Sequence, residues 1–385
     1  MKNKNDLTDF SLNKSLVIMQ KLDQNFLGAI ALCLLLASCG PGPQAGGGIG
    51  GTGQIASVVS GAITGFGSVF VSGYEYETGS TSMMVDGKSG SLTDLKKGML
   101  VRVNATVTER YDTHDVLQRA ANTLLYEDTV EGVVQSVASD GSSLVDLGQT
   151  VAITTSTVVD ASIPGRNVLS LMPGRDLVEV SGFVTGDGAI MGTFIELRTL
   201  DMNTQVPDYE VKGFIKNHNA AQKTFEIGAL TIEYSDARLN DMPGQISGDD
   251  WNGLLVDATG DQVSSGDPGS SGVRMKANLV WPETLGSKDS ENAKVEAFVT
   301  HVRDLSDFSM GIVRVQTSPG TVFEGGTPSD VQVGIRLVVN GPLVDGVVNA
   351  TKVKFEREEE DHAEPTMVNS TGARLPCGDS TVPVC

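Results

Sequence analysis

Hydrophobic and polar residues alternate in short runs along most of the chain, and glycine stands between many of the runs. Residues 145–153 read Val-Asp-Leu-Gly-Gln-Thr-Val-Ala-Ile, and residues 224–234 follow a similar pattern. A period of two is typical of strands that bury one face, and glycine between two runs predicts a hairpin turn. One segment is ambiguous. Val116, Ala120 and Leu124 are also spaced for one face of a helix, so residues 114–125 are predicted as either helix or strand.

The alternating runs recur in four similar units. Each unit opens with a block around an equivalent small residue, which is Gly61, Gly132, Gly213 or Ala297. A second block follows, centred on Gly98, Gly174, Gly253 or Gly334. In the first unit this block reads Gly-Met-Leu-Val-Arg-Val, and we expect its glycine to adopt a positive φ in a tight turn that leads into a strand.

The repeat predicts the fold class and the domain organisation. About five short strands in each unit indicate an all-β protein of tandem five-stranded barrels of the OB kind, because a sheet that small must close to protect its edges. The predicted barrels are residues 58–128, 129–207, 208–289 and 290–358. A leader (1–38) and a tether (39–57) precede them, and a polar tail (359–385) follows. The boundaries fall in linker-like stretches such as Glu127-Asp128, so we expect few core contacts to cross near residues 128, 207 and 289.

An uncharged apolar run, Leu27–Ala37, precedes the first unit. Its length suits a secretory signal, whose apolar region has about 7–15 residues, and is too short for a membrane-spanning helix of about 20. Its end, Leu36-Ala37-Ser38-Cys39, resembles the lipobox of bacterial lipoproteins. The resemblance implies cleavage between Ser38 and Cys39 and lipidation of Cys39. A start at Met19 in place of Met1 would give a leader of more usual length.

The tether is rich in glycine and proline, which is typical of a flexible linker. Within it, Gly48–Gly53 matches the G-x-G-x-x-G pattern of dinucleotide sites. No strand is predicted before this match, so we expect no dinucleotide cofactor. The chain carries 28 Lys and Arg against 48 Asp and Glu, a formal charge of −20, and only 5% of its residues are aromatic. This balance disfavours binding to nucleic acid, which requires basic grooves and exposed aromatic rings.

The four cysteines divide into two pairs. Cys33 leaves with the leader, and Cys39 is the expected lipid acceptor. Cys377 and Cys385 are expected to form a disulfide in an oxidising compartment, with two free thiols as the alternative. A zinc site is less favoured, because no matching His or Cys pair occurs elsewhere.

The sequence shows no catalytic, cofactor or metal motif. The four histidines, which are His114, His218, His301 and His362, have no ligand spacing, and we interpret them as surface or turn residues. No G-x-S-x-G elbow is present. The stretches Gly248–Gly253 and Asp257–Asp261 bring acidic residues together. We interpret them as acidic turns, with a calcium loop as the alternative.

Two glycine-rich blocks, Gly47–Gly53 and Gly61–Gly73, resemble an uncharacterised family of bacterial lipoproteins built from tandem OB-like domains of unknown function. The resemblance covers most of residues 36–358. It implies the fold and a location in the cell envelope, and it brings no activity or site residues.

Two hypotheses for function follow. The favoured one is a non-enzymatic protein anchored by lipid in the outer membrane, facing the periplasm or the cell surface. It would act as a binding or spacer module for another envelope protein or a glycan. Gly40 after Cys39 favours the outer membrane by resemblance to sorted lipoproteins. The alternative is an envelope hydrolase with a site formed between barrels, which acidic and His side chains gathered in one cleft would favour.

Overall fold

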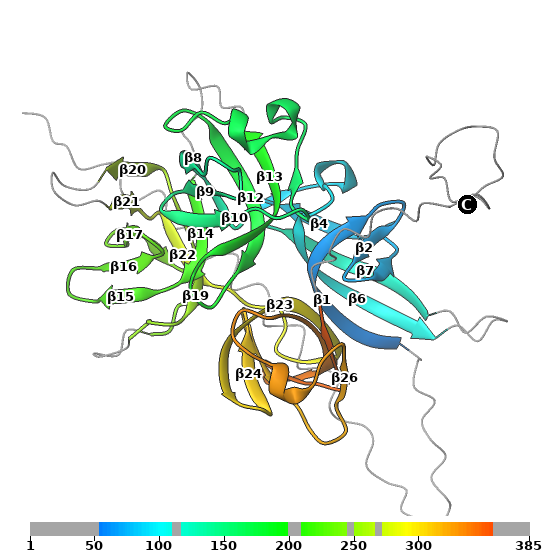
Figure 1. Cartoon of the computed structure of the whole chain (residues 1–385). Helices are drawn as coiled ribbons and strands as arrows, with labels where there is room; N and C mark the ends of the chain where they lie inside the picture. The colour runs from blue at the N-terminus through cyan, green and yellow to red at the C-terminus, as the bar shows by residue number, and fades with distance from the viewer. Residues whose placement is uncertain (1–53, 110–116, 199–208, 245–249, 266–271, 357–385) are drawn as a thin grey trace, which may run out of the picture. The chain divides into compact units, whose positions relative to one another are not determined.

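The computed structural model describes residues 54–109, 117–198, 209–244, 250–265 and 272–356. Every regular element in this part of the chain is a β-strand or a short 3-10 turn (Figure 1), which confirms the predicted all-β class. The segment with an ambiguous pattern forms a strand from Leu117 to Tyr126, and residues 114–116 lie outside the described ranges. Among the described residues, no helix is long and apolar enough to span a membrane.

The second and fourth units, called repeat 2 and repeat 4, each close into a ring of five strands. Repeat 2 contains β8 (Val130–Val137), β9 (Ser143–Asp146), β10 (Gln149–Ala152), β11 (Val158–Val159), η2 (Pro164–Arg166), η3 (Val168–Ser170), β12 (Leu177–Val184) and β13 (Ile190–Arg198). Repeat 4 contains β23 (Ser290–Asp304), β24 (Asp307–Met310), β25 (Val313–Gln316), β26 (Val322–Glu324), η4 (Pro328–Asp330), β27 (Arg336–Val344), β28 (Val347–Asn349) and β29 (Lys352–Phe355). The pairing runs β8–β9–β10–β13–β12–β8 in repeat 2 and β23–β24–β25–β28–β27–β23 in repeat 4. Closure removes the free edges of both small sheets, as the sequence predicts.

Repeats 1 and 3 follow the same strand order with interruptions. Repeat 1 contains β1 (Gln54–Gly65), β2 (Val69–Val71), β3 (Tyr74–Tyr76), β4 (Ser82–Val85), β5 (Lys88–Ser89), η1 (Leu92–Asp94), β6 (Leu100–Glu109) and β7 (Leu117–Tyr126). Repeat 3 contains β14 (Tyr209–Phe214), β15 (Lys216–Asn219), β16 (Thr224–Ile227), β17 (Leu230–Glu233), β18 (Arg238–Leu239), β19 (Leu255–Gly260), β20 (Gln262–Ser265), β21 (Val273–Lys276) and β22 (Leu279–Pro282). A single parallel bridge, Glu77 to Ala120, joins the ends of the ring in repeat 1. In repeat 3 the strands fall into two sheets, β14–β19–β22–β18 and β15–β16–β17–β21–β20. The two hairpins predicted from alternation are β9–β10 and β16–β17.

The glycine at the centre of the second block makes the same turn in every repeat. Its φ is 94° at Gly98, 75° at Gly174, 83° at Gly253 and 88° at Gly334. In each case the glycine N–H donates to the carbonyl two residues after the opening small residue. The acceptors are Ile63, Val134, Ile215 and Val299, at 2.8, 2.7, 2.8 and 2.9 Å. The positive φ explains why glycine occupies this position, and the shared hydrogen bond confirms that the four repeats are equivalent.

The first strands of the repeats join them in pairs. Residues 57–60 of β1 pair in parallel with residues 292–295 of β23, and β8 pairs with β14 in antiparallel fashion. One buried apolar cluster contains residues of both repeat 2 and repeat 3, among them Val130 and Val211, which face each other across β8 and β14. Phe194 of repeat 2 packs into the core of repeat 1 in a similar way. The expectation that few core contacts cross the boundaries is therefore wrong, because the barrels use their first strands and outer faces to pack on one another.

Candidate functional site: charged residues buried where the repeats meet

A pair of facing residues on two neighbouring strands recurs in all four repeats. The pairs are Ser60–Arg102, Glu131–Glu179, Lys212–Asp257 and Glu296–Val338. The residues on either side of Glu179, Val178 and Val180, are fully buried in the apolar core. Since side chains alternate along a strand, Glu179 points away from that core. It is still only 1% exposed. The outer faces of the barrels are therefore covered, and charges on them are buried.

In repeat 3 the facing pair has opposite charges. Lys212 Nζ lies 2.7 Å from Asp257 Oδ2 and 3.1 Å from Glu210 Oε1. Burial opposes the charge of Lys212, but these carboxylates outweigh burial and raise the pKa of Lys212 well above its usual value. Lys212 therefore stays charged, and this buried cation offsets part of the negative charge of the carboxylates around it.

Arg102 of repeat 1 extends this group. Its Nη2 lies 2.7 Å from Glu127 Oε2, and its Nη1 lies 2.9 Å from Glu283 Oε2. Oxygens of Glu127, Asp257 and Glu283 lie within 4.8 Å of one another. We call Arg102, Glu127, Lys212, Asp257 and Glu283 the Lys212 cluster. Each of its three carboxylates has a lysine or arginine nitrogen within 3 Å, so the cluster joins repeats 1 and 3 and holds its own cations.

In repeat 2 the facing pair has like charges, and it belongs to a longer row. Four glutamates, Glu196, Glu179, Glu131 and Glu210, stand opposite one another across β13, β12, β8 and β14. Facing like charges are destabilising. Arg198 offsets part of this repulsion, with Nη1 at 3.0 Å from Glu179 Oε2 and Nε at 3.6 Å from Glu131 Oε1. Lys96 pairs with Glu196 at the far end of the row.

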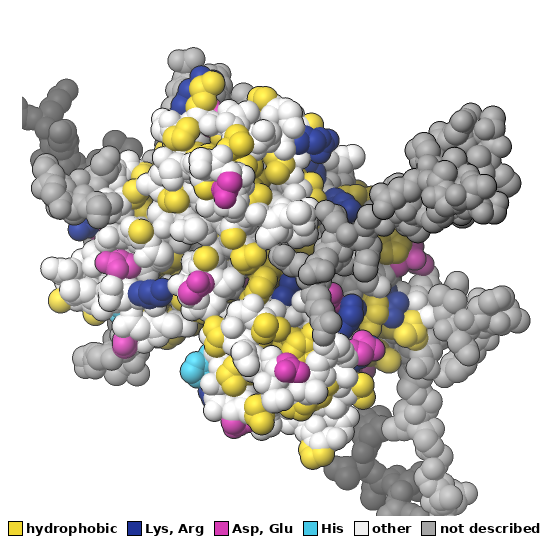
Figure 2. All heavy atoms as spheres, viewed as in Figure 1, with side chains coloured by type: hydrophobic (Ala, Val, Ile, Leu, Met, Phe, Trp, Pro, Cys, Tyr) yellow, Lys and Arg dark blue, Asp and Glu magenta, His cyan; other side chains and the backbone are white. Residues whose placement is uncertain are grey.

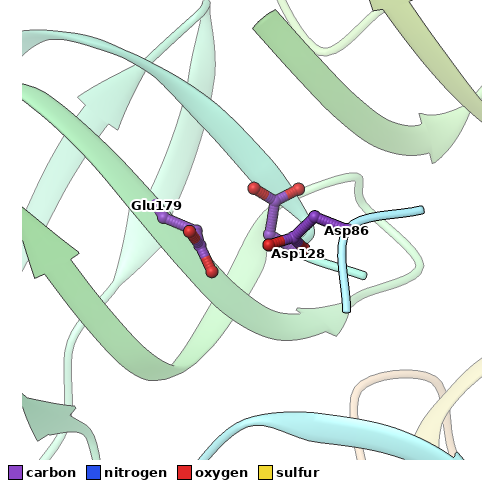
Figure 3. Close-up of side chains that lie close together, drawn as sticks. All are labelled: Asp86, Asp128 and Glu179. Carbon is purple, nitrogen blue, oxygen red and sulfur yellow. The ribbon is translucent and has the colours of Figure 1, made fainter. Parts of the chain in front are cut away.

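Two aspartates from repeat 1 and its junction with repeat 2 approach the middle of this row. Oxygens of Asp86, Asp128 and Glu179 lie within 4.8 Å of one another, and Figure 3 shows the three side chains together. We call them the carboxylate trio. Asp86 follows β4 in an Asp-Gly turn, and both residues of that turn have the positive φ typical of a tight hairpin, 47° at Asp86 and 68° at Gly87. Asp128 follows β7, and Glu179 lies on β12.

The surroundings of the trio favour the protonated form of its carboxyl groups more than water does. Burial, together with the charge of Glu210, raises the pKa of Asp86 to about 6. Burial and the charge of Asp86 raise the pKa of Glu179 to about 8, although Tyr126 Oη donates a hydrogen bond to Glu179 Oε1 at 2.6 Å. Burial also raises the pKa of Asp128 well above its usual value. Three carboxylates in this place are unfavourable unless a proton or another cation joins them.

The structure corrects three interpretations made from the sequence. His218 is not at the surface: its side chain is 2% exposed, stacks on Trp251 with ring centroids 4.5 Å apart, and lies 2.8 Å from Tyr234 Oη. Asp257 is not part of an acidic turn, because it lies in β19 beside Lys212. Asp128 is not an exposed linker residue, because it is 1% exposed. Ser38, Cys39, Cys377 and Cys385 lie outside the described residues, so cleavage, lipidation and the disulfide stay predictions.

A cleft lies between repeats 2 and 4, with a cavity volume of about 670 Å³. The large apolar side chains that line it are Phe183, Met191, Phe298, Val333 and Ile335. Two of these side chains, Val333 and Ile335, are 54% and 37% exposed. On the face drawn in Figure 2, apolar and uncharged side chains predominate and charged ones are scattered. The negative charge of the chain therefore does not form one continuous patch on this face.

The fold and these contacts define a class of protein, an assembly of tandem OB-like β-barrels. Two segments, residues 131–196 and 296–354, match the family model described as a domain of unknown function (DUF5666). The two segments correspond to most of repeats 2 and 4, so the match supports tandem domains and assigns no activity. No curated protein matches the chain.

Proposed function

We propose that this protein is a lipid-anchored envelope protein and that its barrels act as a non-enzymatic binding module for another envelope protein. The cleft between repeats 2 and 4 carries the proposal. Its cavity volume of about 670 Å³ and its exposed apolar side chains leave room for side chains of a partner. The lipobox-like segment that ends at Cys39, followed by the tether, supports a location at a membrane surface.

The lining of the cleft suits an apolar segment of a protein partner. Phe183 and Phe298 form an edge-to-face pair, with ring centroids 5.9 Å apart, and provide a rigid wall. Val333 and Ile335 are exposed beside it and can contact an incoming side chain. Protein interfaces depend on a few such apolar anchors surrounded by polar groups, and Thr185 at this cleft is a polar neighbour of that kind.

The arrangement of titratable groups favours binding over hydrolysis. Three charged residues line the cleft, Asp187, Arg336 and Glu356. Hydrogen bonds from Thr185 and the Ala189 backbone lower the pKa of Asp187, so it remains a carboxylate. Glu356 pairs with Lys354, and Arg336 pairs with Glu296. His218 is held between Tyr234 and Trp251 and does not line this cleft. The acidic clusters lie elsewhere, at the contacts of repeat 1 with repeats 2 and 3. A hydrolase would need an acid and a base to meet in one cleft. Glu127, Lys212 and Glu283 do meet at a smaller cavity of about 130 Å³, but there the two carboxylates are paired with Arg102.

Crosslinking in cells followed by affinity capture tests the proposal. We expect the unmodified protein to capture one envelope protein, and V333D/I335D to lose that partner because charge enters the apolar cleft. Val322→Asp is the matched control. Val322 is 56% exposed on the same repeat and does not line the cleft, so this variant should retain the partner. Equal capture by all three proteins, or capture of glycan alone, would contradict the proposal.

Fatty-acid labelling tests the anchor separately. The unmodified protein should incorporate the label, and Cys39→Ser should lose it and accumulate with its leader attached, because the acceptor thiol is missing. Equal labelling of the two proteins would exclude Cys39 as the lipid acceptor.

A further inference from the structure

We propose that Asp86, Asp128 and Glu179 bind a hard divalent cation such as Ca²⁺, Mg²⁺ or Mn²⁺. The three residues offer one carboxylate oxygen each, and these oxygens lie within 4.8 Å of one another. Oxygen ligands lie about 2.3–2.6 Å from Ca²⁺ and closer to Mg²⁺, so ligands on opposite sides of one ion are separated by about 4–5 Å. One cation placed among the three oxygens therefore reaches all of them.

A second observation points to a ligand. Asp128 is 1% exposed, and its Oδ1 is buried without a hydrogen bond from any described residue. The same holds for Asp86 Oδ1, and among the ion pairs of the described residues the trio takes part in one, between Arg198 and Glu179. A buried carboxylate is normally paired with a cation or coordinates a metal. Asp257 has such a partner in Lys212, whereas Asp128 has none.

The backbone holds the trio in place. The Asp86 N–H donates to the carbonyl of Tyr126 at 3.1 Å, which fixes the turn beside the end of β7. The residue after Asp128, Thr129, donates from Oγ1 to the Gly182 carbonyl at 2.9 Å and accepts from the Gly182 N–H at 3.0 Å. The aspartates therefore cannot separate to relieve their repulsion, and ligands held in this way are arranged for an ion in advance.

The charges also fit a divalent ion. Arg198 pairs with Glu179 and offsets one of the three negative charges. A divalent cation would offset the other two. Tyr126 Oη donates to Oε1 of Glu179 and Arg198 pairs with Oε2, and a carboxylate has lone pairs left to bind a cation as well. The trio lies where repeat 1 meets repeat 2, away from the cleft, so cation binding does not depend on the proposed partner.

Thermal unfolding and equilibrium dialysis of the purified full chain, stripped of metal at neutral pH, test the proposal. CaCl2, MgCl2 and MnCl2 are added separately. At about one hundred times the dissociation constant, we expect at least one cation to raise Tm by about 5 °C. Dialysis should show one bound ion per chain. Asp128→Asn and Glu179→Gln keep the side-chain shapes and should lose both effects, because each removes a charged ligand.

Asp146→Asn is the matched control. Asp146 is also fully buried, on β9 of repeat 2, and is not a member of the trio, so this variant should bind the ion as the unmodified protein does. If a buried variant fails to fold, Asp86→Asn replaces it, since Asp86 lies in a half-buried turn. Absence of bound ion with all three salts would overturn the proposal. Unchanged binding by Asp128→Asn, or equal loss of binding in Asp146→Asn, would overturn it as well.

Discussion

The Lys212 cluster and the carboxylate trio are built on the same structural position and differ in the cations that pair with them. Each contains a carboxylate on the strand that pairs with the first strand of its repeat, Asp257 on β19 and Glu179 on β12, and both are buried where repeats pack. The residue that faces this carboxylate on the first strand is Lys212 in repeat 3 and Glu131 in repeat 2. A change at one repeated position therefore separates a group in which every carboxylate has a cation from a group in which only Glu179 has one.

The difference shows that the repeat determines which position is buried, whereas the neighbouring residues determine how a charge at that position is paired. Packing outer face against outer face buries the same position in successive barrels, so a charge there must find a partner. Lys212 and Arg102 supply that partner within the chain for Glu127, Asp257 and Glu283. In the trio, Arg198 reaches Glu179 and leaves the two aspartates without a cation. The first arrangement is a structural ion-pair network, and the second is suited to a ligand.

Replacing Lys212 should have the largest effect. Lys212→Met keeps most of the side-chain volume and leaves Asp257 buried without its cation, so we expect unfolding to require about 3–5 kcal/mol less free energy. Urea denaturation measures the loss. Lys352→Met is the control, because Lys352 and Glu324 form an exposed pair, 42% and 50% accessible, whose loss should cost less than about 1 kcal/mol. Similar losses in the two variants would contradict a buried role for Lys212.

Giving the facing pair of repeat 2, Glu131–Glu179, the opposite charges of the pair in repeat 3 should have the next largest effect. Glu131→Lys places a cation opposite Glu179 and beside the trio, so we expect affinity for Mn²⁺ to fall at least tenfold, which is about 1.4 kcal/mol. Equilibrium dialysis measures the affinity. Glu226→Lys is the matched control, because Glu226 lies on β16 of repeat 3 and is not part of either cluster. An unchanged affinity in Glu131→Lys would show that the charge at position 131 does not act on cation binding by the trio.

The smallest effect concerns Asp146, a buried carboxyl group outside both clusters. Burial is the main cause that raises its pKa well above the usual value. The folded state then binds more protons than the unfolded state above about pH 4, so the contribution of Asp146 to stability falls as pH rises. Asp146→Asn removes this titration. We expect the stability of the variant relative to the unmodified protein to rise steadily between about pH 4 and pH 8. A constant difference across this range would show that Asp146 has an ordinary pKa.

Local pattern predicted most of the fold. Alternation predicted the strands, and glycine placed the hairpins and the turn at Gly98 and its equivalents, because both signals depend on residues that are neighbours in the chain. The packing of repeats was missed. Val-Asp257-Ala and Val-Glu179-Val fit a strand with one face in water, and nothing in the sequence says that another barrel covers that face. The signal that could have indicated this packing was an acidic residue between two apolar residues of a strand.

The trio was harder to predict, because its members come from three separate segments. In each segment the local sequence accounts for the acidic residue without a binding site. Asp86 belongs to an Asp-Gly turn, and Asp128 lies in a polar stretch that is typical of a linker. From its neighbours in the sequence alone, each would be expected at the surface. Only the contacts of repeat 1 with repeat 2 bring them to Glu179 and bury Asp128.

Anomalous diffraction from crystals of the full chain soaked in MnCl2 tests the central comparison most directly. If the trio binds a divalent cation and the Lys212 cluster holds its own, the anomalous difference map will show a peak among Asp86, Asp128 and Glu179. It will show none among Glu127, Asp257 and Glu283. A map without a peak at the trio, or with a peak beside Lys212, would contradict this account.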